Sequence, residues 1–548
     1  MFPRVKASGR YRYLQIVENR RVDGRHKQQV IASLGRMDEL TESGRLDELT
    51  CRLATLCNEV QIVSAHREGA IRSEGVRRLG PALVFERLWC ALGIDRVLRA
   101  LLAERRFGFE VERAIFLTVL HRLFASGSDR AAEQWREDYR IEGVEDLSLH
   151  QLYRAMGWLG EPLPPDEQGG ATPFSPRCVK DLIEEALFAQ RRDLFTNLDV
   201  VFFDTTSIYF EGEGGDTLGR RGKSKDHRPD LKQLVVGAVL DGEGRPVCCE
   251  LWPGNTTDVK TLLPIVERLR ERFHIGSVCV VADRGMISAK TIEALESMPG
   301  LTYILGARMR KQKEVKTDVL SRPGRYHEVY PKSNDPKAPR PLKVKEVFVE
   351  DRRYIVCHNE DQAHKDAADR EAIVAHLREQ LKRGDKSLVG NKGYRRYLKT
   401  DGRHFDIDEG KLESEARLDG KWVLRTNTVL SSQDTALKYK QLWMIEQLFR
   451  TTKSILETRP IYHKCDETIR GHVFCSFLAL VLKTELYERL EGKRCLYEWE
   501  DIRRDLEALQ ETELRFGDQT YFVRTPLRGT CHDVLRAAGV APPPTLRQ

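Results

Sequence analysis

DVVFFDTT, at residues 199–206, joins an apolar, β-branched run to a carboxylate, Asp204. Such runs are typical of strands that are buried on both faces of a sheet. A second stretch, VCVVADRGM at residues 278–286, repeats the pattern and places Asp283 after its apolar run. The sequence therefore predicts two buried strands, each of which ends at an aspartate.

A third stretch, YKQLWMIEQLFRTTK at residues 439–453, has the spacing of a helix with one chemically distinctive side. Trp443, Glu446, Arg450 and Lys453 recur at three or four residues, so their side chains project along the same side of the helix. Glu446 is the single acid of this stretch. With the two aspartates it makes a set of three carboxylates, and oxygen-only ligand sets suit hard cations such as Mg²⁺ or Mn²⁺.

Each acid also has an ordinary structural interpretation. Asp204 can stabilise a turn after its strand, and Asp283 can cap the next helix, although Ser288 is better placed as that N-cap. Glu446 can pair with Arg450 one helical turn away. The catalytic interpretation therefore depends on all three acids belonging to one pattern.

The order of the predicted elements indicates an α/β fold with a mixed sheet. Strands are expected at residues 198–204, 232–240, 246–252, 277–283 and 301–306, and helices at residues 258–272 and 288–297. The first three strands follow one another without a helix, which implies antiparallel pairing, whereas strand–helix–strand implies a right-handed parallel crossover.

The acids stand in a pattern that resembles the DDE transposases of bacterial insertion sequences, in the branch with a Tyr-x2-Arg-x3-Glu-x6-Lys signature. Three positions of the signature match: Tyr439, Glu446 and Lys453. Its arginine position holds Leu442, so a phosphate contact of that arginine would have to come from a neighbour such as Lys440 or Arg450. GNTTD at residues 254–258, ADRG at 282–285 and RPIYH at 459–463 also resemble this family.

The resemblance implies a ribonuclease-H-like fold and a divalent-metal-dependent polynucleotidyl transferase that performs cut-and-paste transposition. It implies catalytic and metal-binding roles for Asp204, Asp283 and Glu446, with two Mg²⁺ ions for which Mn²⁺ can substitute. Tyr439 and Lys453 would hold phosphates near the cut. The partners that it implies are the element's terminal inverted repeats, target DNA and a second copy of the chain that pairs the two ends.

A basic loop and two tryptophans extend the candidate DNA-binding set. GRRGKSKDHRPDLKQ, at residues 219–233, joins the first two strands, and its basic residues can lie beside the site and bind phosphates, although a solvated loop is the simpler alternative. From this loop and from the helix we select four basic side chains as DNA contacts: Lys223, Lys225, Arg228 and Arg450. We expect Trp252 and Trp443 to be core residues rather than surfaces that stack on a base.

Composition shifts suggest how the chain is divided. The predicted parts are a basic β-hairpin (1–38), a mainly helical, candidate DNA-binding region (39–160), a Pro- and Gly-rich linker (161–176), the first part of the ribonuclease-H-like domain (177–306), a strand-rich insertion (307–430), the helix with the third carboxylate (431–485) and a C-terminal helical region with a tail (486–548).

Composition and charge fit an intracellular globular protein. The 548 residues carry a formal net charge of +7, so DNA binding must depend on local basic patches. Twelve cysteines without a CxxC pair indicate neither a zinc site nor a disulfide scaffold. The N-terminal stretch lacks the apolar core of a signal peptide, the longest apolar run is too short to span a membrane, and we expect a bacterial cytoplasmic, nucleoid-associated protein. A repair nuclease and a non-catalytic, domesticated DNA-binding protein remain the alternatives.

Overall fold

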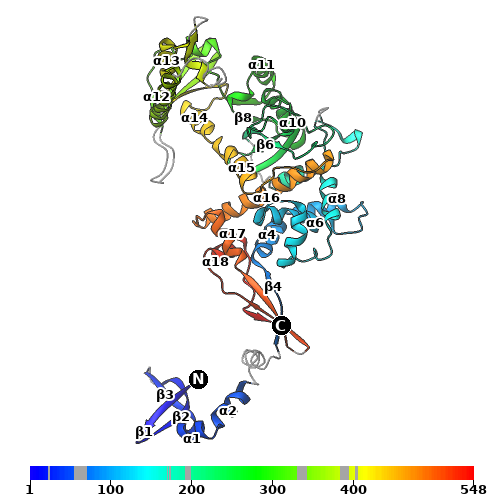
Figure 1. Ribbon diagram of the computed structural model, residues 1–548, viewed down its shortest axis with the longest axis vertical. Coiled ribbons are helices and arrows are strands. Elements are labelled where there is room, and N and C mark those ends of the chain that lie inside the picture. The colour runs from blue at the N-terminus through cyan, green and yellow to red at the C-terminus, as the bar shows by residue number, and fades with distance from the viewer. Residues whose placement is uncertain are drawn as a thin grey trace. The chain divides into compact units, whose positions relative to one another are not determined.

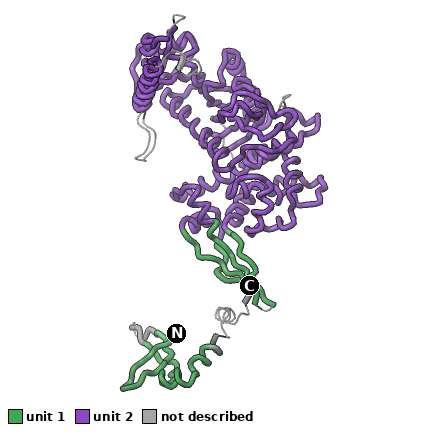
Figure 2. The backbone as a smooth tube through the Cα atoms, viewed as in Figure 1, with its two compact units in different colours: residues 1–79, 507–528, 542–548 green, residues 80–506, 529–541 purple. Residues whose placement is uncertain are grey.

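The computed structural model describes residues 1–22, 25–54, 71–169, 171, 175–191, 199–329, 342–382, 394–400, 405–516 and 518–548. The turn of the predicted N-terminal hairpin, at residues 23–24, and residues 170 and 172–174 of the predicted linker lie outside these ranges. Two compact units are present (Figure 2). Unit 1 comprises Met1–Leu79, Glu507–Arg528 and Pro542–Gln548, and unit 2 comprises Gly80–Leu506 and Gly529–Ala541.

The N-terminal part of unit 1 is an antiparallel sheet with three strands. β2 (Tyr11–Val22) and β3 (Arg25–Arg36) form the predicted hairpin, and β1 (Phe2–Ser8) pairs with the free side of β2. β1 was not predicted from the sequence, because FPRVKAS lacks an alternating apolar pattern, and its residues are mostly exposed in the structure. Two short helices, α1 (Met37–Glu42) and α2 (Arg45–Ala54), follow.

A second sheet of unit 1 joins distant parts of the sequence and corrects two predictions. Its order is β18-β17-β16-β4, with the bounds β4 Ile71–Arg78, β16 Gln510–Phe516, β17 Gln519–Arg524 and β18 Leu546–Arg547. β4 lies inside the region 39–160 that was predicted to be helical, and the other three lie inside the C-terminal region 486–548. β4 has the sequence IRSEGVRR, whose polar character hides a strand that is completed by a partner from the far end of the chain.

Helices 4 to 9 open unit 2. They are α4 (Gly80–Ala91), α5 (Ile94–Leu102), α6 (Val111–Phe124), α7 (Asp129–Trp135), α8 (Leu149–Leu159) and α9 (Val179–Arg191). The long α16 (Asp466–Gly492) packs on α6 and α8, and a Cβ at Gly471 would lie 1.9 Å from the Met156 carbonyl oxygen, so this crossing requires glycine. No described helix has the length and apolarity needed to cross a membrane.

The last helices of unit 2 are α17 (Trp499–Glu507) and α18 (Cys531–Ala538).

The predicted linker does not separate the two units, because residues 161–169 belong to unit 2. Its backbone pairs with the residues before α9, where the Leu163 amide donates to the Arg177 carbonyl oxygen at 2.8 Å. The Pro- and Gly-rich composition thus marks an irregular but packed connection.

A mixed sheet of nine strands forms the centre of unit 2, in the order β10-β11-β12-β15-β9-β8-β5-β6-β7. Two of its strands, β6 and β8, are labelled in Figure 1. Its bounds are β5 Val200–Tyr209, β6 Gln233–Leu240, β7 Pro246–Pro253, β8 Val278–Ala282, β9 Leu301–Gly306, β10 His327–Val329, β11 Leu342–Val349, β12 Arg352–His358 and β15 Lys421–Thr426. β5 pairs antiparallel with β6 and parallel with β8, which confirms the predicted mixed sheet.

Four strands of the predicted insertion continue this sheet, and two shorter strands pair with each other in a separate sheet. β15 pairs antiparallel with β9, and β12, β11 and β10 follow it outward. Four smaller elements complete the segment: α12 (Glu360–Lys382), β13 (Leu398–Thr400), β14 (Phe405–Ile407) and α13 (Glu409–Ala416). The insertion therefore widens the sheet on the side away from β7.

Alternation along β5 places Asp204 on a defined face of the sheet. Val201 and Phe203 pack in the core under α10 (Leu262–Phe273) and α11 (Ala289–Ser297), whereas Val200 and Phe202 pack in the core under α14 (Ser432–Lys440) and α15 (Trp443–Ser454). Because side chains alternate along a strand, Asp204 faces the α14–α15 side. β5 continues to Tyr209, so Asp204 lies within the strand and not at its predicted end.

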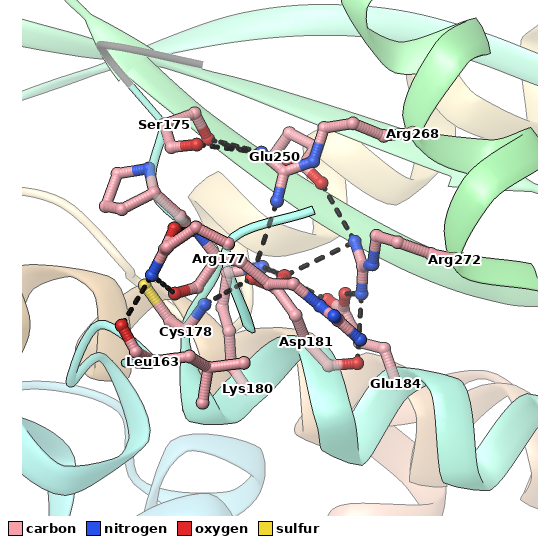
Figure 3. Close-up of polar contacts among 12 residues, drawn as sticks. Leu163, Ser175, Arg177, Cys178, Lys180, Asp181, Glu184, Glu250, Arg268 and Arg272 are labelled. Atoms are coloured by element: carbon pink, nitrogen blue, oxygen red, sulfur yellow. Dashed lines mark hydrogen bonds and ion pairs between the residues drawn. The ribbon is translucent and has the colours of Figure 1, made fainter. Parts of the chain in front are cut away.

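A buried ion network fixes α9 to the sheet (Figure 3). Arg272 on α10 is surrounded by carboxylates, at 2.6 Å from Glu184, 3.0 Å from Glu250 and 3.3 Å from Asp181. Lys180 lies 2.7 Å from Asp181, and Arg268 lies 2.9 Å from Glu250. These six side chains are buried, so each charge depends on its partners for stabilisation.

Candidate active site

Asp204 lies within β5 in surroundings that disfavour its charge. Burial is the main cause that raises the pKa of its carboxyl to about 6, and the nearby charges of Asp283 and Asp258 raise it further. Lys225 and the Thr205 backbone N–H, which donates to Oδ1 at 2.7 Å, act in the opposite direction. A carboxylate that is partly buried and near other acids is typical of a functional site.

Asp283 follows β8, the parallel neighbour of β5, so the two aspartates come from adjacent strands. The Tyr439 hydroxyl donates to Asp283 Oδ1 at 3.1 Å. Arg308 supports the loop after Asp283 by donating to the Arg284 and Gly285 carbonyl oxygens at 2.9 and 2.8 Å. Tyr439, predicted to hold a phosphate, therefore lies against a carboxylate, and burial and that carboxylate both raise its pKa.

Asp258, at the end of GNTTD, is a fourth acid beside the site. Thr205 Oγ1 donates to its Oδ1 at 2.8 Å, and Lys225 Nζ lies 3.4 Å from the same oxygen. A Cβ on Gly285 would lie 3.6 Å from Asp258 Oδ2 and 3.8 Å from Asp283 Oδ2, so both acids border this glycine. Asp258 was not among the predicted site residues, although its motif, GNTTD, is one of the segments that resemble the family.

Glu446 is an exposed residue on α15, and the buried side of that helix holds it over the sheet. Ile445 and Phe449 pack in the same core as Phe202 of β5, so α15 covers the face on which Asp204 lies. Trp443 is 57% exposed, which corrects its prediction as a core residue. Trp252 is buried, as predicted.

Leu442 occupies the arginine position of the signature and is buried in the core under α15. Its apolar side chain contributes to packing and offers no hydrogen-bond donor to DNA. The signature's missing arginine is therefore a real loss at this position of the helix.

Three of the predicted basic DNA contacts form hydrogen bonds or ion pairs within the chain. Lys225 Nζ donates to the Thr205 carbonyl oxygen at 2.6 Å, and Lys453 Nζ donates to Asp226 at 2.7 Å. Arg228 pairs with Asp230 at 2.9 Å. Two further side chains, Lys223 and Arg450, are exposed.

The acids near β5 fit a divalent cation by their chemistry. Asp204, Asp258 and Asp283 offer carboxylate oxygens, the ligand type that Mg²⁺ and Mn²⁺ prefer. Among the described residues, however, the acids of the predicted triad do not gather within 4.8 Å of one another.

A different group does reach that separation, namely Asp129, His463 and His472. His463 Nε2 lies 3.2 Å from Asp129 Oδ2, and Arg122 Nη2 lies 2.9 Å from His472 Nδ1. The Arg122 guanidinium occupies the lone pair that a metal would need, so the arrangement is a buried hydrogen-bonded network.

Comparison with known families decides what kind of site this is. Residues 196–482, more than half of the chain, match the model of the transposase DDE domain. The chain belongs to the DDE transposases. Residues 3–65 match the model of the IS1634 family transposase N-terminal domain, which makes it a transposase of an insertion sequence. Among curated proteins, none matches the chain.

The match confirms the predicted family, the ribonuclease-H-like α/β fold and the enzyme class. The transposase is a metal-dependent polynucleotidyl transferase that acts on DNA, and its family uses divalent metal ions. The matched segment contains the three predicted acids, Asp204, Asp283 and Glu446, together with the acid that the structure adds, Asp258.

Proposed function

We propose that the transposase binds the terminal inverted repeats of its element and catalyses strand cleavage and strand transfer with Asp204, Asp283 and Glu446. One observation carries this assignment. Asp204 and Asp283 come from adjacent parallel strands, and α15, which carries Glu446, packs on the face of β5 where Asp204 lies. All three acids lie within the segment that matches the family.

The roles of the side chains follow from the chemistry of phosphodiester cleavage. We assign the three acids as ligands of two Mg²⁺ ions, for which Mn²⁺ can substitute, and these ions would activate the attacking oxygen and stabilise the leaving oxygen. Tyr439 orients Asp283 through its hydroxyl. Lys225 holds Asp258 and Thr205 beside Asp204. Water frees a 3′-OH at the element end, and that hydroxyl then attacks the second strand or target DNA.

The proposal also includes the oligomeric state on DNA and the place in the cell where the transposase works. Cut-and-paste transposition joins two element ends, so we infer a homodimer in the complex with DNA. We also infer that it works at the bacterial nucleoid, in the cytoplasm, where its chromosomal substrate lies. Two exposed basic side chains, Lys223 and Arg450, are candidates for contacts to the DNA backbone.

A cleavage assay tests the function directly. Purified protein is incubated with a labelled duplex that ends in the inverted repeat flanking its own gene, with Mg²⁺, with Mn²⁺ or with EDTA. The expected result is metal-dependent nicking at the repeat boundary, absent from a duplex with a scrambled repeat. Equal cutting of both duplexes would favour a general nuclease, and binding without cleavage under each metal condition would favour a non-catalytic DNA-binding protein.

The pKa of Asp204 predicts how metal binding depends on pH. A cation needs the ionised carboxylate, and burial raises the pKa of Asp204 to about 6. Affinity for Mn²⁺ is therefore expected to be nearly constant above this pKa and to fall up to about tenfold per pH unit below it. Calorimetric titration of the DNA-free protein measures this profile. Asp204→Asn should bind Mn²⁺ more weakly and lack the inflection, whereas an unchanged inflection in that variant would assign it to another group.

A further inference from the structure

A buried acid in the loop between β5 and β6 holds two cations near β5, the strand that carries Asp204. The carboxylate of Asp226 lies 2.7 Å from Lys453 Nζ and 2.5 Å from Arg459 Nη1. The Asp226 side chain is 4% exposed, whereas those of Lys453 and Arg459 are 14% and 28% exposed. The acid is thus more buried than the two cations. One carboxylate neutralises only one of them, so the cluster presents a net positive charge to solvent.

Asp226 depends on these two cations for its own stability. Its Oδ2 atom is buried and accepts no hydrogen bond from the part of the chain that the structure describes. A buried carboxylate with an unsatisfied oxygen is costly unless its ion pairs are strong. The two ion pairs therefore fix the positions of both cations and also the conformation of the loop that carries Asp226.

Neighbouring contacts tie this cluster to the catalytic strand. Lys225, which precedes Asp226, donates to Thr205 Oγ1 at 2.9 Å, and Thr205 follows Asp204. At the C-terminal end of β5, the Arg459 guanidinium lies 5.7 Å from the centre of the Tyr209 ring. A strand rises about 3.3 Å per residue, so Tyr209 lies roughly 17 Å from Asp204, within reach of a DNA strand that enters the site.

We propose that Arg459 and Lys453 clamp a backbone phosphate of the DNA substrate and that Asp226 is the positioning residue for both cations. An arginine has five N–H donors in a fork that matches a phosphate, and the bond to Asp226 leaves donors for it. The clamp deepens the proposed transposase function and rests on it, because it names the DNA strand at that site as the ligand.

Arg459→Gln tests the clamp by removing one positive charge. The affinity for the repeat-end duplex, measured by fluorescence anisotropy in EDTA, is expected to fall roughly tenfold. The slope of log K against log salt should decrease in magnitude by about 1, as for one lost phosphate contact. Arg459→Lys keeps the charge and should retain part of the affinity. Arg270→Gln, on α10 across the sheet, is the matched control and should bind like the unaltered protein.

Asp226→Asn tests whether Asp226 positions the two cations or only repels the DNA by its negative charge. Removing an acid normally tightens DNA binding, and Asp230→Asn, in the same loop with a side chain 58% exposed, should do so or have no effect. Asp226→Asn is expected to weaken binding by roughly three- to tenfold, because the two cations lose the group that holds them together. Thermal melting of each variant identifies a fold that is lost, and Arg459→Gln tests the clamp independently of that outcome.

The outcomes separate the clamp from the proposed function. Binding is measured without divalent metal, so it does not depend on cleavage. Unchanged affinity and salt slope in Arg459→Gln would overturn the clamp even if the unaltered protein cleaves normally, and tighter binding by Asp226→Asn would overturn the positioning role. A protein that binds through Arg459 but does not cleave would retain the clamp and lose the transposase activity.

Discussion

Glu446→Gln is expected to lower the rate of strand cleavage at the repeat end by about 10³-fold or more. The exchange keeps the shape of the side chain and removes the charge that would bind the metal. The loss of roughly 4 kcal/mol of transition-state stabilisation corresponds to this factor. Because Glu446 is exposed, folding should be unaffected, so the effect reports chemistry and not stability. Single-turnover cleavage of labelled duplex at saturating protein measures it.

The control for Glu446→Gln is Glu457→Gln, which removes an exposed acid shortly after the same helix. Both variants should bind the repeat-end duplex in EDTA with affinities close to that of the unaltered protein. Asp204→Asn and Asp283→Asn should match Glu446→Gln in cleavage. Cleavage by Glu446→Gln at the unaltered rate would remove this acid from the active site and leave the role of α15 without support.

The part of the site that could be predicted follows from local sequence patterns. Buried strands ending near Asp204 and Asp283 are visible as apolar runs, and Glu446 is visible as a single acid in an otherwise basic and apolar helix. The mixed pairing of β5 with β6 and β8 follows from which strands are separated by helices. These features depend on a few neighbouring residues, so one sequence contains them.

Contacts between distant segments could not be predicted in this way. β4 reads as polar, and its partner β16 lies near the other end of the chain. The ion pairs of Asp226 join a loop after β5 to Lys453 in the last turn of α15 and to Arg459 beyond that helix, and nothing in the local sequence distinguishes this acid from Asp230. Trp443 is exposed for the same reason, since burial depends on which elements cover a helix face.

Arg272→Gln is expected to destabilise unit 2 by about 3–5 kcal/mol, the usual cost of removing one partner from a buried ion pair. Arg272 contacts Asp181, Glu184 and Glu250, which are buried, and also Glu185 at 2.8 Å. After the exchange, Lys180 and Arg268 remain as the cations of the network in Figure 3. Urea denaturation followed by tryptophan fluorescence measures the loss.

The pH dependence of this loss distinguishes electrostatics from packing. Burial already raises the pKa of Glu184, and removal of the nearby Arg272 charge should raise it further. A carboxyl whose pKa is raised in the folded state binds more protons there than in the unfolded chain, so stability recovers as pH falls through the raised value. The difference between Arg272→Gln and the unaltered protein should therefore shrink on going from about pH 8 to about pH 5. Arg270→Gln on the same helix should show little loss at either pH, and an equal loss for Arg272→Gln at both would assign the effect to packing.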